Sequence, residues 1–245
     1  MLFCIPADAQ LNESDTALFQ IRAGLTGAAQ KGNVDLLVLR GNVELVANKN
    51  SLYVFKIQSN SLYQSFGGFK ADNDMNSRSY FYVNPFRKLY PFAMVYAQTN
   101  YRRQINFRWF GGVGITWQFV QTPNTVLKLS TSLVHENTGF SNTQFNEPTY
   151  NGTETIRLWR ATMYLTGWHN LADHHLKLYY RAYMQPGFDR VANNRAQVDI
   201  GFDFPVWKGL SAFAQYSYIY EQVVAVSVQQ YDRILTFGIS FQLKK

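Results

Sequence analysis

A regular alternation of apolar and polar residues constrains this chain more than any other feature of its sequence. It is clearest in the segment 105–120. There one face holds Ile105, Phe107, Trp109, Val113, Ile115, Trp117 and Phe119, and the other holds Asn106, Arg108, Gly112, Gly114, Thr116 and Gln118. A period of two residues is typical of a β-strand with two different faces. The segments 196–206 and 231–243 repeat it, so we predict strands rather than helices.

Alternating segments separated by turn residues continue along most of the chain. We predict about twelve strands, an even number as in single-chain bacterial barrels, at residues 17–30, 34–47, 52–65, 76–86, 92–103, 105–120, 126–136, 156–168, 176–185, 196–206, 210–220 and 231–243. No stretch reaches the roughly 18 apolar residues of a membrane-spanning helix. The predicted fold is therefore all-β, a single closed antiparallel transmembrane barrel formed by residues 17–245.

Alternation alone does not distinguish this barrel from a soluble one, whose apolar face points inward. The predicted strands run to roughly a dozen residues, whereas soluble strands average about five or six, and tilted strands of about nine to eleven cross a bilayer. Phe107 and Trp117 lie about 33 Å apart along one strand, or about 25 Å along the membrane normal, which matches two aromatic girdles. The predicted girdle residues are Phe107, Trp109, Trp117, Phe119, Trp159 and Phe241. The longest predicted connections, 137–155, 186–195 and 221–230, fall on one side, as in outer-membrane barrels.

The charged residues are spread singly over the predicted strands. The net charge is +7, yet the chain has no basic run or recognition helix that would follow phosphates, so we predict no nucleic-acid binding. The polar faces instead indicate a wet lumen in which Asp199 and Asp203 pair with cations such as Arg181 and Lys177. The predicted lumen-lining charges are Arg22, Arg40, Glu44, Lys56, Arg78, Arg108, Lys128, Lys177, Arg181, Asp199 and Asp203.

The first residues resemble the end of a secretory signal. Residues 2–6 are mostly apolar, and Ala7-Asp8-Ala9 fits the small-x-small cleavage rule, so we assign residues 1–9 to a signal remnant and 10–16 to a short N-terminal tail. Cys4, the only cysteine, would leave with the signal. Export is therefore expected, with the outer membrane of a Gram-negative bacterium as destination. The expected partners are outer-membrane lipid and, during biogenesis, the barrel-assembly machinery.

Several short motifs resemble those of the salt-induced outer-membrane protein family, a group of barrels with a domain of unknown function. The motifs are Gly32-Asn33 between the first two strands, Asn84-Pro85-Phe86, Tyr101-Arg102-Arg103 and Gly111-Gly112-Val113-Gly114. The resemblance covers most of residues 17–245. It implies an exported outer-membrane barrel without a known reaction.

Candidate catalytic and metal-binding residues are few. Some outer-membrane barrels are phospholipases, and His135 is the one plausible base, but Ser130 and Ser132 point to the opposite face. His169, Asp173, His174 and His175 gather in one turn without the spacing of a known metal site. We therefore predict no enzyme activity, no metal and no cofactor.

Two functions stay open, a narrow pore for small solutes and an occluded structural or partner-binding barrel. Barrels of about eight strands are filled by side chains and those of about sixteen leave a channel, so about twelve is intermediate. Inward Arg22, Arg40, Lys56, Arg78, Arg108, Tyr80, Tyr82, Tyr179 and Tyr183 are bulky. We predict a narrow or occluded lumen, with a slight anion preference if it conducts.

Overall fold

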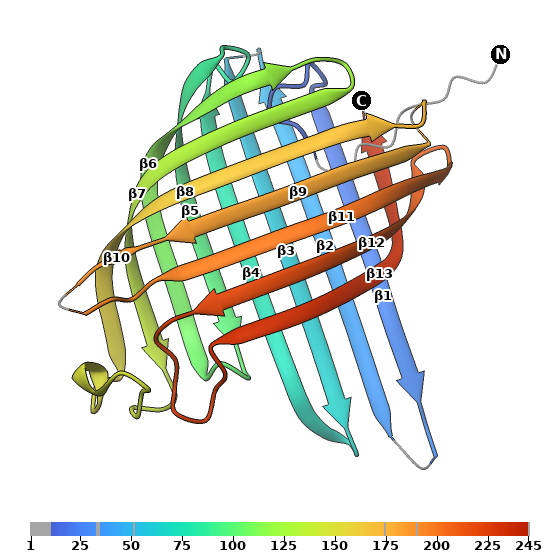
Figure 1. Cartoon of the computed structure of the whole chain (residues 1–245). Coiled ribbons are helices and arrows are strands. Elements are labelled where there is room, and N and C mark those ends of the chain that lie inside the picture. Colours follow the sequence, from blue (N-terminus) through green and yellow to red (C-terminus); the bar gives the residue numbers. More distant parts are fainter. Residues whose placement is uncertain (1–10, 33–34, 51, 174, 190, 245) are drawn as a thin grey trace.

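A closed ring of antiparallel strands forms the whole architecture (Figure 1). The computed structural model describes residues 11–32, 35–50, 52–173, 175–189 and 191–244. Its elements are β1 (Phe19–Gln30), β2 (Leu36–Lys49), β3 (Tyr53–Phe66), β4 (Phe69–Val83), β5 (Leu89–Asn100), β6 (Ile105–Gln121), β7 (Thr125–Phe140), η1 (Pro148–Tyr150), β8 (Thr155–Leu171), β9 (Leu176–Gln185), β10 (Gly187–Phe188), β11 (Arg195–Trp207), β12 (Leu210–Glu221) and β13 (Tyr231–Lys244).

Every long strand pairs with its neighbours in sequence, and two further contacts keep the ring continuous. β1 pairs with β13, with Gln20 opposite Lys244, and β9 pairs with both β8 and β11. The two-residue β10 adds to β8 beyond the end of β9. The described residues thus contain twelve long strands, which confirms the predicted closed antiparallel barrel. No helix in the described part of the chain is long and apolar enough to cross a membrane.

The two ends of the barrel differ. β1 begins and β13 finishes at one end, which we call the terminal end. The long connections after β7, β10 and β12 all lie at the opposite end, which we call the loop end, as the sequence predicted. These connections pack on one another there. Asn146 N donates to Val224 O at 3.0 Å, and Tyr150 donates to Asp189 Oδ2 at 2.7 Å.

Some predicted strand limits were wrong. β4 begins at Phe69 rather than Asn76, because Gly67 and Gly68, with φ of 58° and 77°, form a tight turn directly after β3. β7 continues to Phe140 instead of ending at residue 136, and β5 ends at Asn100. The missed segments are polar on both faces or irregular, so the backbone ladder continues where the apolar alternation has stopped.

The outer surface is apolar over the strands, as predicted. Val113 is 67% exposed, and Leu235, Phe237 and Ile239 of β13 are 59–71% exposed, while their neighbours in sequence turn inward. Ile105 is an exception to the predicted faces. A register shift between Ile105 and Phe107 turns Ile105 inward, where it is 3% exposed and packs in a cluster with Phe140 and Phe145.

Val113 lies at the middle of β6 and tests whether this surface faces lipid. We expect Val113→Arg to destabilise the barrel in lipid vesicles by about 2–4 kcal/mol, because a charge at the bilayer midplane loses its hydration. Urea-dependent folding into vesicles measures the difference. The matched control is Phe69→Arg, at the loop-end rim, with an expected cost of at most about 1 kcal/mol. Equal effects of the two variants would contradict a lipid-facing centre.

Candidate functional site: the charged interior

The interior of the barrel contains a cavity of about 310 Å³. Most of the predicted lumen charges line it: Arg22, Arg40, Glu44, Arg78, Arg108, Arg181 and Asp199. Lys56 and Lys128 instead line a smaller cavity of about 30 Å³ next to the N-terminal segment. Lys177 and Asp203 are 1% exposed. Tyr80, Tyr82, Tyr179 and Tyr183 also line the large cavity, as expected.

The predicted aromatic girdle residues lie on the outer surface. Phe107, Trp109 and Trp159 lie toward the loop end, whereas Trp117, Phe119 and Phe241 lie toward the terminal end. All are at least 39% exposed except Phe119, which is partly buried against the Trp117 ring at a centroid distance of 5.4 Å. The positions therefore form two groups near opposite ends of the strands.

Two ion pairs run along the inner wall near β11. Arg181 Nη2 lies 3.2 Å from Asp199 Oδ2, which is the pairing predicted for Asp199. Asp203 accepts hydrogen bonds from Arg22 at 2.8 and 3.0 Å, and Lys177 is its cross-strand neighbour. Arg22 also donates to Ser240 Oγ at 3.1 Å. Asp199 therefore neutralises a cation on the adjacent strand β9, and Asp203 neutralises one on β1, three strands away.

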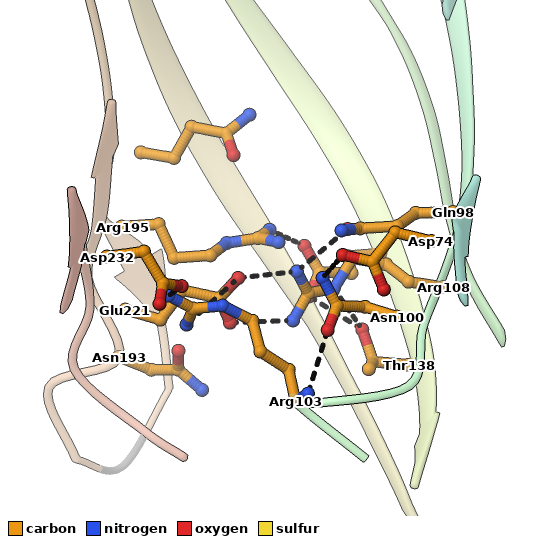
Figure 2. A network of polar contacts seen from close by, with 12 residues as sticks. Asp74, Gln98, Asn100, Arg103, Arg108, Thr138, Asn193, Arg195, Glu221 and Asp232 are labelled. Atoms are coloured by element: carbon orange, nitrogen blue, oxygen red, sulfur yellow. Dashed lines mark hydrogen bonds and ion pairs between the residues drawn. The ribbon is translucent and has the colours of Figure 1, made fainter. Parts of the chain in front are cut away.

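A larger network of charges crosses the barrel near the loop end (Figure 2). Arg108 of β6 donates to both carboxylate oxygens of Glu221 on β12, at 2.8 and 2.9 Å. Arg103, in the turn before β6, lies 2.5 Å from Asp232 of β13 and 3.8 Å from Glu221. β6 and β12 lie on nearly opposite walls of the ring. The bonds therefore bridge the lumen and narrow it.

Glu136 forms a second centre of the same network. It is 1% exposed and pairs with Arg160 at 2.8 Å, with Arg195, and with Arg108 at 3.8 Å. Sequence reasoning did not select Arg103, Arg160 or Arg195. The alternation of faces does predict that two of them point inward, because Arg160 follows the outward Trp159 and Arg195 precedes the outward Ala196. Arg103 lies in a turn, where side chains do not alternate between two faces and no direction can be predicted.

The N-terminal segment, residues 11–18, enters the terminal end of the barrel. Leu11 is 1% exposed and belongs to an apolar cluster with Val46, Val54 and Tyr82. Its carbonyl oxygen accepts a 2.6 Å hydrogen bond from Lys56 Nζ. Residues 11–16, predicted only as a tail, therefore fill part of the lumen.

Glu13 anchors this segment between two walls. Its Oε1 lies 2.8 Å from Lys128 Nζ of β7 and accepts a 2.9 Å hydrogen bond from the Tyr90 hydroxyl, while its Oε2 lies 3.5 Å from Lys56 Nζ of β3. Burial raises the pKa of Glu13, but the ammonium groups of Lys128 and Lys56 outweigh it and lower the pKa from 4.5 to about 2. The carboxylate is therefore charged at neutral pH.

The histidines considered as candidates have other neighbours. His135 lies on the outer surface between Trp109 and Trp159, with centroid distances of 6.0 and 5.1 Å, while Ser130 and Ser132 line the interior cavity. His169 contacts Thr125 Oγ1 and the Tyr180 hydroxyl, each at 3.2 Å. His174 lies outside the described residues, and the others contain no cluster of three His, Cys, Asp or Glu suited to a metal ion.

One family description covers almost all of this barrel. The family described as protein of unknown function, DUF481, matches residues 21–242. The chain belongs to this family. The match agrees with the domain of unknown function implied by the sequence resemblance. No curated protein matches the sequence.

Solved structures resemble this DUF481 barrel in fold. The NanC porin shares 9% identity with a TM-score of 0.53, and the alignment covers 92% of this chain and 100% of that one. The translocator domain of the autotransporter NalP from Neisseria meningitidis shares 12% identity with a TM-score of 0.48, over 96% and 90% of the two chains. The likeness to NanC shows that this DUF481 chain has the fold of an outer-membrane barrel.

The Glu13 ion pairs make docking of the N-terminal segment dependent on pH. Because the docked pKa is lowered, the pairs contribute their full stabilisation above about pH 4.5 and lose it as the pH falls through about 2. A carboxyl carbon NMR titration of glutamate-labelled protein should show Glu13 titrating near pH 2. The resonance is assigned by its absence in Glu13→Gln. A midpoint near 4.5 would show that the segment is not docked in this way.

Proposed function

We propose that this chain is an outer-membrane protein of a Gram-negative bacterium and forms a narrow pore for small anionic solutes. The observation that supports this function is the composition of the large cavity wall. Among the described residues that line it, eight are arginines and five are aspartates or glutamates. An excess of fixed positive charge in a narrow passage raises the local concentration of anions.

The outer-membrane location is supported by the apolar exterior and by the fold. Lipid is the solvent that stabilises exposed side chains such as Leu235 and Phe237, and a closed ring leaves no unpaired strand edge in it. The alternating Phe237, Ile239 and Phe241 of the last strand suit recognition by the barrel-assembly machinery. The resemblance to salt-induced outer-membrane proteins fits the same location.

The described residues narrow the terminal end of the proposed pore to a cavity of about 30 Å³. Tyr80, Tyr82 and Tyr164 line both the large cavity and the 30 Å³ cavity, and therefore stand between them. Leu11 and Glu13 line the terminal side of the smaller cavity. We expect passage of a solute to require movement of the N-terminal segment. The same narrowing favours a second candidate function, an occluded structural or partner-binding barrel.

Planar-bilayer recordings decide between these two functions. We expect small conductance steps whose reversal potential in a KCl gradient shifts toward the chloride equilibrium potential. Glu13→Lys should raise the conductance several-fold, because three like charges at residues 13, 56 and 128 would repel the N-terminal segment.

The control variant is Glu154→Lys, which makes the same change of charge at an exposed position of the loop end, away from the two lysines. Large cation-selective steps would contradict the anion pore. Silence of both the natural protein and Glu13→Lys would favour the occluded barrel.

We also propose that the barrel has no lipid-hydrolysing activity. His135 is packed between two tryptophans, and the serines of its own strand line the interior. Thr131 shares the outward face of β7 but lies four residues along the strand, about 13 Å from His135, which is too far for a hydrogen bond. Purified protein and His135→Ala should release fatty acid from phospholipid vesicles at the same background rate. Activity that disappears in His135→Ala would overturn this proposal.

A further inference from the structure

Two of the eight arginines that line the large cavity form no ion pair with a carboxylate in the described residues. The other six each form at least one: Arg22, Arg102, Arg103, Arg108, Arg181 and Arg195. Arg40 donates instead to Thr236 Oγ1 at 2.6 Å. Arg78, in the second half of β4, is partly buried and faces the cavity without a carboxylate partner in the described chain.

Four tyrosines lie within electrostatic reach of the Arg78 guanidinium. They are Tyr80, Tyr96, Tyr164 and Tyr183, of β4, β5, β8 and β9. Its Cζ lies 5.8 Å from the centroid of the Tyr96 ring. All four tyrosines line the cavity. A hydroxyl that accepts a hydrogen bond from the guanidinium keeps its own hydrogen to donate elsewhere. The group therefore offers several donors to the cavity.

Arg181 adds a second positive charge beside this group. It interacts electrostatically with both Arg78 and Tyr164. Its partner Asp199 already accepts hydrogen bonds from Gln197 at 3.0 and 2.9 Å, and Arg181 Nε has no hydrogen-bond partner in the described structure. Glu44 also interacts electrostatically with Arg181, but no ion pair in the described residues joins either of these acids to Arg78. The charge of Arg78 therefore stays without a carboxylate of its own. The remaining charge is costly in a half-buried site unless an anion offsets it.

We propose that Arg78, together with the Tyr164 hydroxyl and Arg181, binds the oxyanion group of a small solute, a carboxylate or a phosphate. The planar guanidinium suits both groups because its N–H donors match two of their oxygens. A volume of about 310 Å³ is at the lower end for small-molecule pockets. The cavity extends to Arg102 and Asp232, which are partly exposed at the loop end and mark the entry side. The site specifies the chemical group that a solute of the proposed pore would carry. Binding at the site does not depend on the pore, but transport of the solute rests on that proposed function.

The aromatic wall next to Arg78 fits the rest of such a solute. Tyr80, Tyr82 and Phe92 form a cluster with centroid distances of 5.6–6.0 Å and line the same cavity. The rings are buried against one another and are 6–7% exposed, so the edge that each presents to the cavity can contact the carbon framework of a small acid. The cavity therefore combines one oxyanion position with an apolar wall.

Equilibrium binding to the full-length refolded protein in detergent tests the site. The probes for isothermal titration calorimetry are inorganic phosphate, glucuronate and glucose, the last having the sugar ring without the carboxylate. We expect phosphate, glucuronate or both to bind and glucose not to bind, and the pattern distinguishes a phosphate from a carboxylate ligand. If neither oxyanion binds more tightly than glucose, the proposal is wrong.

The decisive variant is Arg78→Gln. It should weaken oxyanion binding by about tenfold or more, because a charge-assisted hydrogen bond is lost. It should leave unfolding by urea unchanged, since Arg78 has no carboxylate that the substitution would leave unpaired. Arg78→Lys keeps the charge without the planar fork and should bind with intermediate affinity. Arg157→Gln, on the exposed face of β8, is the control with the same change of charge.

Natural affinity in Arg78→Gln, or an equal loss in Arg157→Gln, would overturn the site. If Arg78→Gln does not fold, the Lys variant decides, and natural affinity in that variant overturns it. Oxyanion binding that depends on Arg78, without any bilayer current, would support the binding site and contradict the pore. An anion current without oxyanion binding would support the pore and contradict the binding site.

Discussion

Closure of the sheet is the constraint on which the rest of the molecule depends. The β1–β13 pairing gives the backbone N–H and C=O groups of both end strands hydrogen-bond partners. In an open sheet these groups would have none. Closure also divides every strand into an outer and an inner face. The outer face then takes the apolar side chains, and the inner face must take all those that remain, charges included.

The inner charges are stabilised mainly by one another. Arg108 and Glu221 come from nearly opposite walls, and Arg22 and Asp203 from walls three strands apart. A buried charge without a partner is costly, so each such pair holds two distant strands at a fixed separation. The interior is not uniformly charged, however. Val46, Val54, Phe92, Phe110 and Val134 form an apolar cluster within it.

The N-terminal segment is an extension of this interior rather than an appendage. Glu13 supplies a carboxylate between Lys56 and Lys128, and Leu11 supplies an apolar side chain beside Val46 and Val54. Without Glu13, Lys56 would keep Glu44 as an acid partner and Lys128 would face the charge of Lys56. The segment fills much of the terminal end in this way, and the large cavity, with Arg78 in it, lies on the loop-end side of it.

The sequence alone was sufficient for the fold class, the approximate strands and the direction of side chains such as Arg108, Trp117 and Asp199, because a period of two fixes which face each residue takes. It was also sufficient for the Asp199–Arg181 pair, whose members lie on adjacent strands. It was not sufficient to predict the start of β4, where backbone hydrogen bonds continue through residues that are polar on both faces. It was also not sufficient to predict the direction of Ile105, which a register shift turns inward.

Only the tertiary structure decided which charges meet across the lumen and which two cavity arginines form no ion pair with a carboxylate in the described residues. Arg108 and Glu221 are 113 residues apart, and Glu13 and Lys128 are 115 residues apart. The alternation along a strand predicts which side chains point into the barrel. It does not predict which side chains of the opposite wall they meet. Ring closure, strand register and the course of the N-terminal segment set those distances, and they become defined only when the whole barrel has formed.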